Sequence, residues 1–342
     1  IYMLYKYLIC KILDIYILSM VYLYQDNLSS RIKMELITVQ PHEITEMKIT
    51  LEEAIEAFLT DHDIADSSRH TYSRSLRQFT SWICETGRDD RLDLQREDIL
   101  EYKDYLSDKS SYTVTLYLTA VRKLYQWLES KRIYPDITRG IKGAKKPKGF
   151  RKDTLTEEQL NKALKAMEKR SLRGLRDYAI FNLMARTGLR DIEVSRALIE
   201  DIRQEAGQPV LWIQGKGRDT KDDFVLLTDE ALKPIKRYLK IRNSVQEGDP
   251  LFCSHSDRNT GEALTSRSIS RIVKKALRRI GLDDRRLTAH SLRHTAITLS
   301  IKGGASLQQA QAMARHTDPK TTLVYFHNLD RIQAGAEKFI DF

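Results

Sequence analysis

The chain is poor in cysteine, and its cysteines form no recognisable pattern. Cys10, Cys84 and Cys253 are scattered and never stand in a CxxC pair. An odd, scattered set argues against a disulfide framework and a structural zinc site, and it is typical of a reducing, cytosolic compartment. We interpret Cys84 and Cys253 as small, buried hydrophobic side chains.

Long uncharged apolar runs are also lacking. The first 24 residues are the most apolar part of the chain, but Lys6, Lys11 and Asp14 interrupt them. The uncharged stretch that follows is shorter than the roughly 20 residues that a membrane-spanning helix needs. A secretory signal peptide fits poorly because no small-residue cleavage site follows. We therefore expect residues 1–47 to be a poorly ordered or spurious N-terminal extension, and we expect no membrane partner.

Acidic residues are outnumbered by basic ones. The 342 residues include 57 Lys and Arg against 47 Asp and Glu, which gives a net charge of +10. This excess favours a polyanionic partner, although it is weak support by itself. The length suits two domains at roughly 150 residues each.

Residues 48–135 predict a small all-helical domain. Leu51, Ile55, Phe58 and Leu59 recur at the spacing of one helix face. Three further helical segments are expected, from a cap at Asp66 or Ser67 to Gly87, over about 96–109, and over 112–131.

Residues 136–152 interrupt the helical pattern with glycine, proline and basic side chains. The basic residues are Lys142, Lys145, Lys146, Lys148, Arg151 and Lys152. One interpretation is a solvated hinge between domains. The other is a DNA-binding strap that follows a phosphate backbone, and we favour it because of the motifs downstream.

The remaining residues, 153–342, predict a second domain. Thr156 and Gln159 have the spacing of a capping box at the start of a helix. A strongly apolar helix is expected to end at Gly188. Two short β-rich runs on either side of KGRDTK predict a hairpin with a basic tip, and the sequence from Thr228 onward reads as mostly helical.

Five chemically suggestive residues occur in a fixed order in this second domain. Arg190 lies in ARTGLRDIEV, His290 and Arg293 lie in HSLRH, and His316 precedes Tyr325 by nine residues. An arginine offers a planar fork of donors to phosphate oxygens. A tyrosine hydroxyl can attack phosphorus and hold it as an ester. Each residue alone has an ordinary structural explanation, but together they predict a phosphoryl-transfer site.

These motifs resemble the tyrosine recombinases, the integrase family of site-specific DNA recombinases. The resemblance covers roughly residues 48–330 and implies a mainly α fold with a small antiparallel β-sheet. It implies a helical core-binding (SAM-like) DNA-binding domain at 48–135, a basic interdomain linker at 136–152, and a catalytic domain with a C-terminal tail at 153–342. The implied activity is cleavage and rejoining of duplex DNA through a 3′-phosphotyrosyl intermediate, for integration, excision or resolution of a mobile element or chromosome dimer.

The resemblance also assigns roles to particular residues. It implies catalytic roles for Arg190, Lys216, His290, Arg293, His316 and Tyr325, with Tyr325 as nucleophile and Glu193 supporting the first arginine. His290 is the candidate that accepts the tyrosine proton, because histidine titrates near neutrality. Lys216, on the predicted hairpin, would protonate the departing 5′ oxygen.

The implied reaction needs neither metal ion nor cofactor. The arginines would supply the charge that metals supply elsewhere, and the phosphotyrosyl ester would conserve the bond energy without ATP. The implied partners are a double-stranded recombination site, further copies of the chain as a dimer on the core site and a synaptic tetramer, and an optional accessory DNA-bending or directionality protein. The expected location is the cytoplasm, associated with the nucleoid.

Three alternatives remain open on the sequence. The same residues suit a type IB topoisomerase-like enzyme. A second alternative, from a different class of protein, is a DNA-binding architectural factor without catalysis. His290 and His294 could share a helix face and bind a metal, but Ser291 stands where HExxH motifs have glutamate and no third ligand is evident. We interpret His294 as a buried packing residue.

The chain departs from the family pattern at one position and leaves its tail open. The family usually has glycine before His316, whereas this chain has Arg315, which we expect either to face solvent or to contact a phosphate. Residues 326–342 predict a short amphipathic helix. Docking of this tail on a neighbouring protomer and folding back on its own domain are equally compatible with the sequence.

Overall fold

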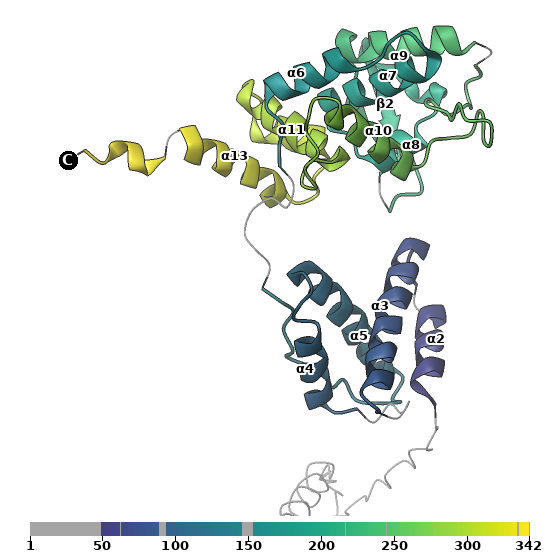
Figure 1. The fold of residues 1–342 in the computed structure, drawn as a ribbon, viewed down its shortest axis with the longest axis vertical. Helices are drawn as coiled ribbons and strands as arrows, with labels where there is room; N and C mark the ends of the chain where they lie inside the picture. Colours follow the sequence, from purple (N-terminus) through teal and green to yellow (C-terminus); the bar gives the residue numbers. More distant parts are fainter. Residues whose placement is uncertain are drawn as a thin grey trace, which may run out of the picture. The chain divides into compact units, whose positions relative to one another are not determined.

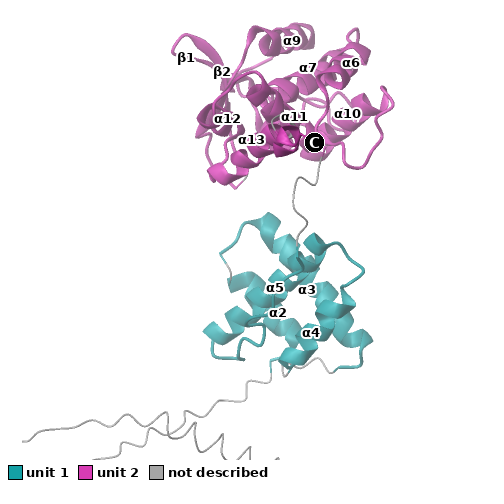
Figure 2. Cartoon of the chain, turned by 90° about the vertical axis from the view of Figure 1, so that its left-hand side faces the viewer, with its two compact units in different colours: residues 1–145 teal, residues 146–342 magenta. Residues whose placement is uncertain are grey.

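The computed structural model describes residues 49–61, 63–88, 94–145, 153–215, 217–243, 245–333 and 335–341. The chain divides between Lys145 and Lys146 into two compact units, coloured separately in Figure 2. Both are dominated by helices, and one small antiparallel sheet lies in the second unit (Figure 1), so the expected fold class is confirmed. Of the described helices, none is both long enough and apolar enough to cross a bilayer.

Several residues singled out in the sequence fall outside the described ranges. They are the expected N-terminal extension at 1–47, the linker residues Lys146, Lys148, Arg151 and Lys152, and Lys216.

The first unit is a bundle of helices around an aromatic core. Its helices are α2 (Leu51–Asp61), α3 (Asp66–Glu85), α4 (Arg96–Tyr105) and α5 (Ser111–Ser130). Phe58, Phe79 and Tyr102 are fully buried. The rings of Phe79 and Tyr102 meet edge to face with centroids 4.8 Å apart, a geometry that aromatic pairs prefer. This unit corresponds to the helical segments predicted from the apolar spacing.

Two details of the first unit differ from the sequence-based expectation. The residue at the N-cap of α3 is Ala65, which offers no side-chain hydrogen bond, so the expected cap at Asp66 or Ser67 is wrong. Cys84 near the end of α3 is exposed, which corrects its interpretation as a buried hydrophobic side chain. Gly87 follows α3 with a positive φ of 66°, as expected for the residue that ends a helix.

The second unit contains most of the helices and the sheet. Its helices are α6 (Glu157–Ala166), α7 (Leu172–Thr187), α8 (Asp191–Arg196), α9 (Asp229–Arg242), α10 (Ser266–Arg278), α11 (Ala289–Lys302), α12 (Leu307–Ala314) and α13 (Pro319–Gln333), with the short 3-10 helices η1 (Ile199–Asp201) and η2 (Ala336–Phe339). The predicted capping box at α6 is confirmed, because Thr156 Oγ1 accepts from Gln159 N at 3.1 Å and Gln159 Oε1 accepts from Thr156 N at 2.9 Å.

The sheet has three strands in the order β1–β2–β3, which are β1 (Ile202–Glu205), β2 (Gln208–Ile213) and β3 (Asp223–Leu226). In the antiparallel register, Leu211 pairs with Ile202 on one side and with Val225 on the other. The β2–β3 hairpin was predicted. Strand β1 was not predicted because its sequence, IRQE, is short and mostly polar.

The helices α7 and α11 form the centre of the second unit (Figure 1). Helix α7 buries Ile180, Phe181, Leu183 and Met184 completely, so it has no wide solvent-facing stripe in its middle. Helix α11 is buried along most of its first eight residues, and its Thr295 Oγ1 accepts a hydrogen bond of 2.8 Å from Leu155 N. Close packing around both helices therefore fixes the residues at their ends.

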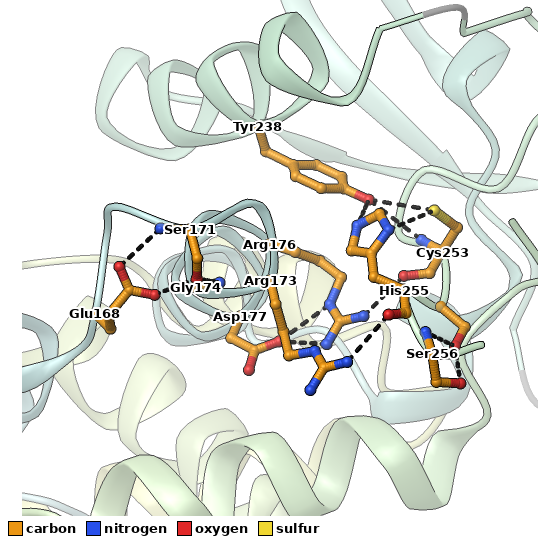
Figure 3. A network of polar contacts seen from close by, with 11 residues as sticks. Glu168, Ser171, Arg173, Gly174, Arg176, Asp177, Tyr238, Cys253, His255 and Ser256 are labelled. Carbon is orange, nitrogen blue, oxygen red and sulfur yellow. Dashed lines mark hydrogen bonds and ion pairs between the residues drawn. The ribbon is translucent and has the colours of Figure 1, made fainter. Parts of the chain in front are cut away.

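A polar network joins α7, α9 and the loop at 253–256 (Figure 3). Arg176 Nη1 donates to Cys253 O at 2.9 Å, and Arg173 Nη2 donates to His255 O at 3.0 Å. The hydroxyl of Tyr238 lies 3.1 Å from His255 Nε2. Burial, together with the nearby arginine charges, lowers the pKa of His255 to about 4. The loop is thus held to two core helices, and Cys253 within it is buried as predicted.

Candidate active site

Gly188 ends α7 and sets the position of Arg190. Its φ of 63° is in the left-handed region that favours glycine, and its N–H donates to Met184 O at 3.0 Å. The chain turns sharply there, and Arg190 becomes the N-cap residue of α8. The prediction that the apolar helix ends at Gly188 is confirmed.

Arg190 is held by Glu193, one turn further along the chain. Glu193 Oε1 accepts from Arg190 Nη1 and Glu193 Oε2 accepts from Arg190 N, both at 2.7 Å. The carboxylate is fully buried, whereas the Arg190 side chain remains 29% exposed. Burial opposes the charge on Glu193, but the charges of Arg315 and Arg190 and the hydrogen bonds offset it and lower the pKa of the carboxyl. Arg190 is therefore anchored at one edge of its guanidinium.

Arg293 lies on α11 and is almost completely buried, with 1% of its surface exposed. Its Nη1 donates to Gly188 O at 2.8 Å, and its Nη2 donates to Ala314 O at the end of α12. Burial and the charges of Arg190 and Arg315 lower its pKa to about 9, so the side chain still carries its charge at neutral pH. One guanidinium thus ties α11 to the C-terminal ends of α7 and α12, which are far apart in the sequence.

A small pocket lies where these helix ends meet. Its lining residues are Leu189, Arg190, Asp191, Ile192, Ala289, His290 and Arg293. Two arginines and one histidine therefore line the same pocket. Such a set of donors is complementary to a phosphate or to the trigonal-bipyramidal phosphorus that forms when a phosphodiester is attacked.

Tyr325 lies on α13 and is 3% exposed. Its ring packs with Ile297 of α11 and Ala314 of α12. Its hydroxyl is 2.5 Å from His294 Nδ1, and its ring stacks on His316 with centroids 6.3 Å apart. Burial raises the pKa of Tyr325 to about 12, while the charges of Arg293 and Arg190 act in the opposite direction. The hydroxyl is therefore protonated at neutral pH and could act as a nucleophile only with a proton acceptor beside it.

The interpretation of His294 as a buried helix residue is confirmed, and the structure adds a polar contact that the sequence did not indicate. His294 is buried, yet its Nδ1 contacts the Tyr325 hydroxyl, and its ring meets that of His290 edge to face at 4.5 Å between centroids. Burial and the charges of His290 and Arg293 lower its pKa to about 4, so it is neutral at physiological pH. The helical spacing of HSLRH was the only sequence signal, and it suggested a metal pair instead.

His316 lies between α12 and α13, where its Nδ1 is 2.8 Å from Thr322 Oγ1. Burial lowers its pKa to about 4, and the charges of Arg293, Arg190 and Arg315 act in the same direction. A neutral imidazole can donate one hydrogen bond and accept another. Among the described residues, no cluster of three or more His, Cys, Asp or Glu side chains is arranged to hold a metal ion.

Arg315 does not face solvent, so that alternative is wrong, and the expected phosphate contact stays a prediction. Its side chain is 6% exposed and forms an ion pair of 2.8 Å between Nη2 and Glu193 Oε2. Its Nη1 also donates to Met313 O at 2.5 Å. The departure from glycine is visible in the sequence, but the distant carboxylate that receives this arginine is not.

The structure therefore brings Arg190, Glu193, Arg293, His316 and Tyr325 together around the ends of α7, α11 and α12, with His290 lining the pocket. Lys216 lies outside the described residues. The neighbouring Gly215 is tied to α8, because its carbonyl accepts a hydrogen bond of 3.1 Å from Arg196 Nη1.

Comparison with known proteins identifies relatives of both units. A sequence profile of the phage integrase family matches residues 153–331, and one of the phage integrase N-terminal SAM-like domain matches residues 55–132. Tyrosine recombinase XerD of Listeria monocytogenes serotype 4b is 26% identical over 290 residues, which cover 82% of this chain and 94% of XerD.

Solved structures share the fold at lower sequence identity. The XerH site-specific recombinase bound to its palindromic difH substrate, a post-cleavage complex, has a TM-score of 0.67 at 22% identity and covers 84% of this chain and 85% of its own. A lambda integrase tetramer bound to a Holliday junction has a TM-score of 0.62 at 18% identity, covering 82% and 78%. The two profile matches span most of the chain, and the first spans more than half of it. The chain therefore belongs to the phage integrase family of tyrosine recombinases.

Proposed function

We propose that this protein is a site-specific DNA recombinase that cleaves and rejoins duplex DNA through a covalent bond between Tyr325 and a 3′ phosphate. The observation that carries the proposal is the pocket lined by Arg190, His290 and Arg293. Two guanidinium groups at one pocket suit the non-bridging oxygens of a scissile phosphate. Family membership and the DNA complexes of XerH and lambda integrase support the same substrate.

The proposed cleavage step balances as a transesterification. Tyr325 Oη attacks phosphorus, the bond from phosphorus to the 5′ oxygen breaks, and a 3′-phosphotyrosyl ester and a free 5′ hydroxyl result. The tyrosine proton passes to the His290–His294 pair, of which His294 contacts the hydroxyl. Lys216 remains the proposed donor of a proton to the departing 5′ oxygen, and His316 the proposed donor to a phosphate oxygen.

Rejoining is the reverse step, with a 5′ hydroxyl attacking the phosphotyrosyl ester. One phosphodiester is exchanged for another phosphate ester, so the reaction as proposed draws no energy from ATP. Exchange of strands needs two DNA sites, and the tetrameric lambda integrase complex supports a tetramer of this chain on DNA. We place this activity on duplex DNA at the nucleoid, in the cytoplasm.

Two surface features support contacts beyond the catalytic pocket. Lys142 and Lys145 lie at the end of the first unit and belong to the basic linker that we propose as a phosphate-binding strap. In the C-terminal tail, Phe339 is 83% exposed and Ile340 62% exposed. An exposed apolar tip favours docking on a neighbouring protomer.

The test is capture of the covalent intermediate. Duplex fragments of the DNA that flanks its own gene, nicked near each candidate cleavage position, are incubated with the full chain in EDTA and then denatured. We expect a protein–DNA adduct from the native protein, none from Tyr325→Phe, and an undiminished adduct from the control Tyr178→Phe. An adduct that persists in Tyr325→Phe, or no adduct from the native protein on any fragment, contradicts the proposal.

A further inference from the structure

Arg315 occupies a backbone position that is unfavourable for it. It follows α12 with φ 53° and ψ 48°, the left-handed conformation that glycine adopts without a Cβ penalty. For a non-glycine residue this conformation is energetically unfavourable because its Cβ crowds the backbone. Such strain persists only where the surrounding structure fixes the residue.

The side chain of Arg315 carries a second cost. Its Nε is buried, and among the described residues it has no hydrogen-bond partner. A buried donor without a partner loses its hydrogen bond to water and is destabilising. Both costs are set against the buried ion pair that Arg315 forms with Glu193.

The ion pair of Arg315 with Glu193 connects it to Arg190. Its Nη2 lies 2.8 Å from Glu193 Oε2, the same oxygen that accepts the Arg190 backbone N–H. The other oxygen, Glu193 Oε1, accepts from Arg190 Nη1 at 2.7 Å. One buried carboxylate is therefore shared between Arg315 on one side and Arg190 on the other.

Several charged side chains meet in this cluster. Arg190, Arg293 and Arg315 all act on the buried carboxylate of Glu193, while Asp191 lines the pocket and Asp223 acts on Arg315. Arg315 is buried and Arg190 is partly open to solvent. The buried guanidinium can fix the carboxylate, and the open one can still reach an anion in the pocket.

We propose that Arg315 is a positioning residue that acts through Glu193, holding the carboxylate in the orientation that presents Arg190 to the scissile phosphate. This inference rests on the proposed function, because it concerns how the cleavage pocket is oriented. It assigns Arg315 no contact with DNA. It also gives a physical role to the arginine that stands where glycine is usual.

The experiment measures cleavage and binding separately. The full chain is mixed in excess with the nicked duplex that gives the adduct, and the rate of adduct formation is followed in a single turnover, alongside the Kd for uncleaved duplex. We expect Arg315→Gly to slow adduct formation about tenfold or more while Kd changes less than twofold. Arg315→Lys, which keeps the charge, is expected to recover part of the rate.

A double-mutant cycle tests whether Arg315 acts through Glu193. Glu193→Gln alone is expected to slow cleavage, and adding Arg315→Gly to it is expected to change the rate less than twofold further. Independent, multiplying losses overturn the proposal, because they require a path that bypasses Glu193. A weaker Kd with a reduced salt dependence in Arg315→Gly also overturns it, since that result marks a direct phosphate contact.

The Arg315→Gly variant also serves as a control for folding. Glycine suits the backbone at position 315, so Arg315→Gly relieves strain and is expected to fold, which the thermal midpoint checks. A native cleavage rate in folded Arg315→Gly refutes the positioning role and leaves the recombinase assignment intact. Failure of the native protein to form any adduct refutes the proposed function instead.

Discussion

His294 Nδ1 lies 2.5 Å from the hydroxyl of Tyr325, and both side chains are buried. The histidine is neutral at physiological pH because its pKa is lowered to about 4, while burial raises the pKa of Tyr325 to about 12. A neutral imidazole beside a protonated phenol is suited to accept its proton as the phenol attacks. The reactive hydroxyl is thus paired with a side chain that the sequence pattern marked only as packing.

Replacement of His294 is expected to impair cleavage chemistry more than DNA binding. His294→Ala and His294→Gln should each slow single-turnover adduct formation about 100-fold, because general-base catalysis is typically worth 10²–10⁴-fold. Raising the pH from 7 to 9 should recover more of the rate in these variants than in the native protein, since hydroxide then assists removal of the tyrosine proton. Rates and Kd values measured across this pH range check both expectations.

Comparison of His290→Gln with His294→Gln distinguishes the two candidate proton acceptors. If His290→Gln shows the steep pH recovery and His294→Gln cleaves at the native rate, His294 only fills space and the assignment to His294 is refuted. Loss in both variants indicates that the two edge-to-face imidazoles act as a pair.

Replacing Arg293 with lysine should abolish most cleavage while the protein still binds DNA. Lysine keeps a charge but cannot donate to Gly188 O and Ala314 O and also offer a planar fork to phosphate. Loss of one preorganised donor typically costs 10²–10³-fold in rate. Adduct formation and Kd on the nicked duplex give the two measurements.

The matched control for this variant is Arg286→Lys. The Arg286 side chain is 61% exposed and pairs with Asp153 at the surface, so its replacement should leave cleavage unchanged. Native-like cleavage by Arg293→Lys would remove Arg293 from the proposed site.

The second unit should lose stability as the pH falls from 7 toward 4. The pKa of His255 is about 4 in the folded protein, against an ordinary value near 6.5, so the unfolded chain takes up a proton over this range and the folded one does not. Each such proton lowers the free energy of unfolding by up to about 1.4 kcal/mol per pH unit, and partial exposure of His255 reduces its share. Pulse proteolysis in urea, with surviving fragments identified by mass, measures this unit in the full chain.

His255→Asn is expected to reduce that pH dependence, because asparagine does not titrate, while His294 and His316 of the same unit still contribute. His255 lies in the network of α7 and α9 and outside the pocket with Arg190 and Arg293, so cleavage at pH 7 should be little affected (Figure 3). An identical pH slope in the variant and the native protein would show that His255 contributes nothing to acid sensitivity.

Features encoded over a few neighbouring residues were predictable from the sequence. The capping box of Thr156 and Gln159 and the left-handed turn at Gly188 depend on local backbone geometry, and both were found as expected. The order of the motifs around Arg190, Arg293 and Tyr325 was enough to identify the family.

Contacts between distant segments were not predictable. The pairing of Arg315 with Glu193 joins residues 122 positions apart, and the contact of His294 with Tyr325 depends on how α13 packs on α11. Strand β1 forms because β2 offers it an edge, since its own four residues carry little β signal. In each case the tertiary environment decides what local propensity leaves open.

The hydrogen bond to the carbonyl of Gly188 links the arrangement of the two arginines to completion of the fold. This carbonyl accepts a hydrogen bond from Arg293, a residue 105 positions later in the chain, and it stands two residues before Arg190. The two arginines are therefore brought into register only after α11 has docked against the end of α7. A nascent or partly unfolded chain, in which that docking is missing, lacks the arrangement of the two arginines that we propose for cleavage. Completion of the fold thus acts as a safeguard on strand breakage.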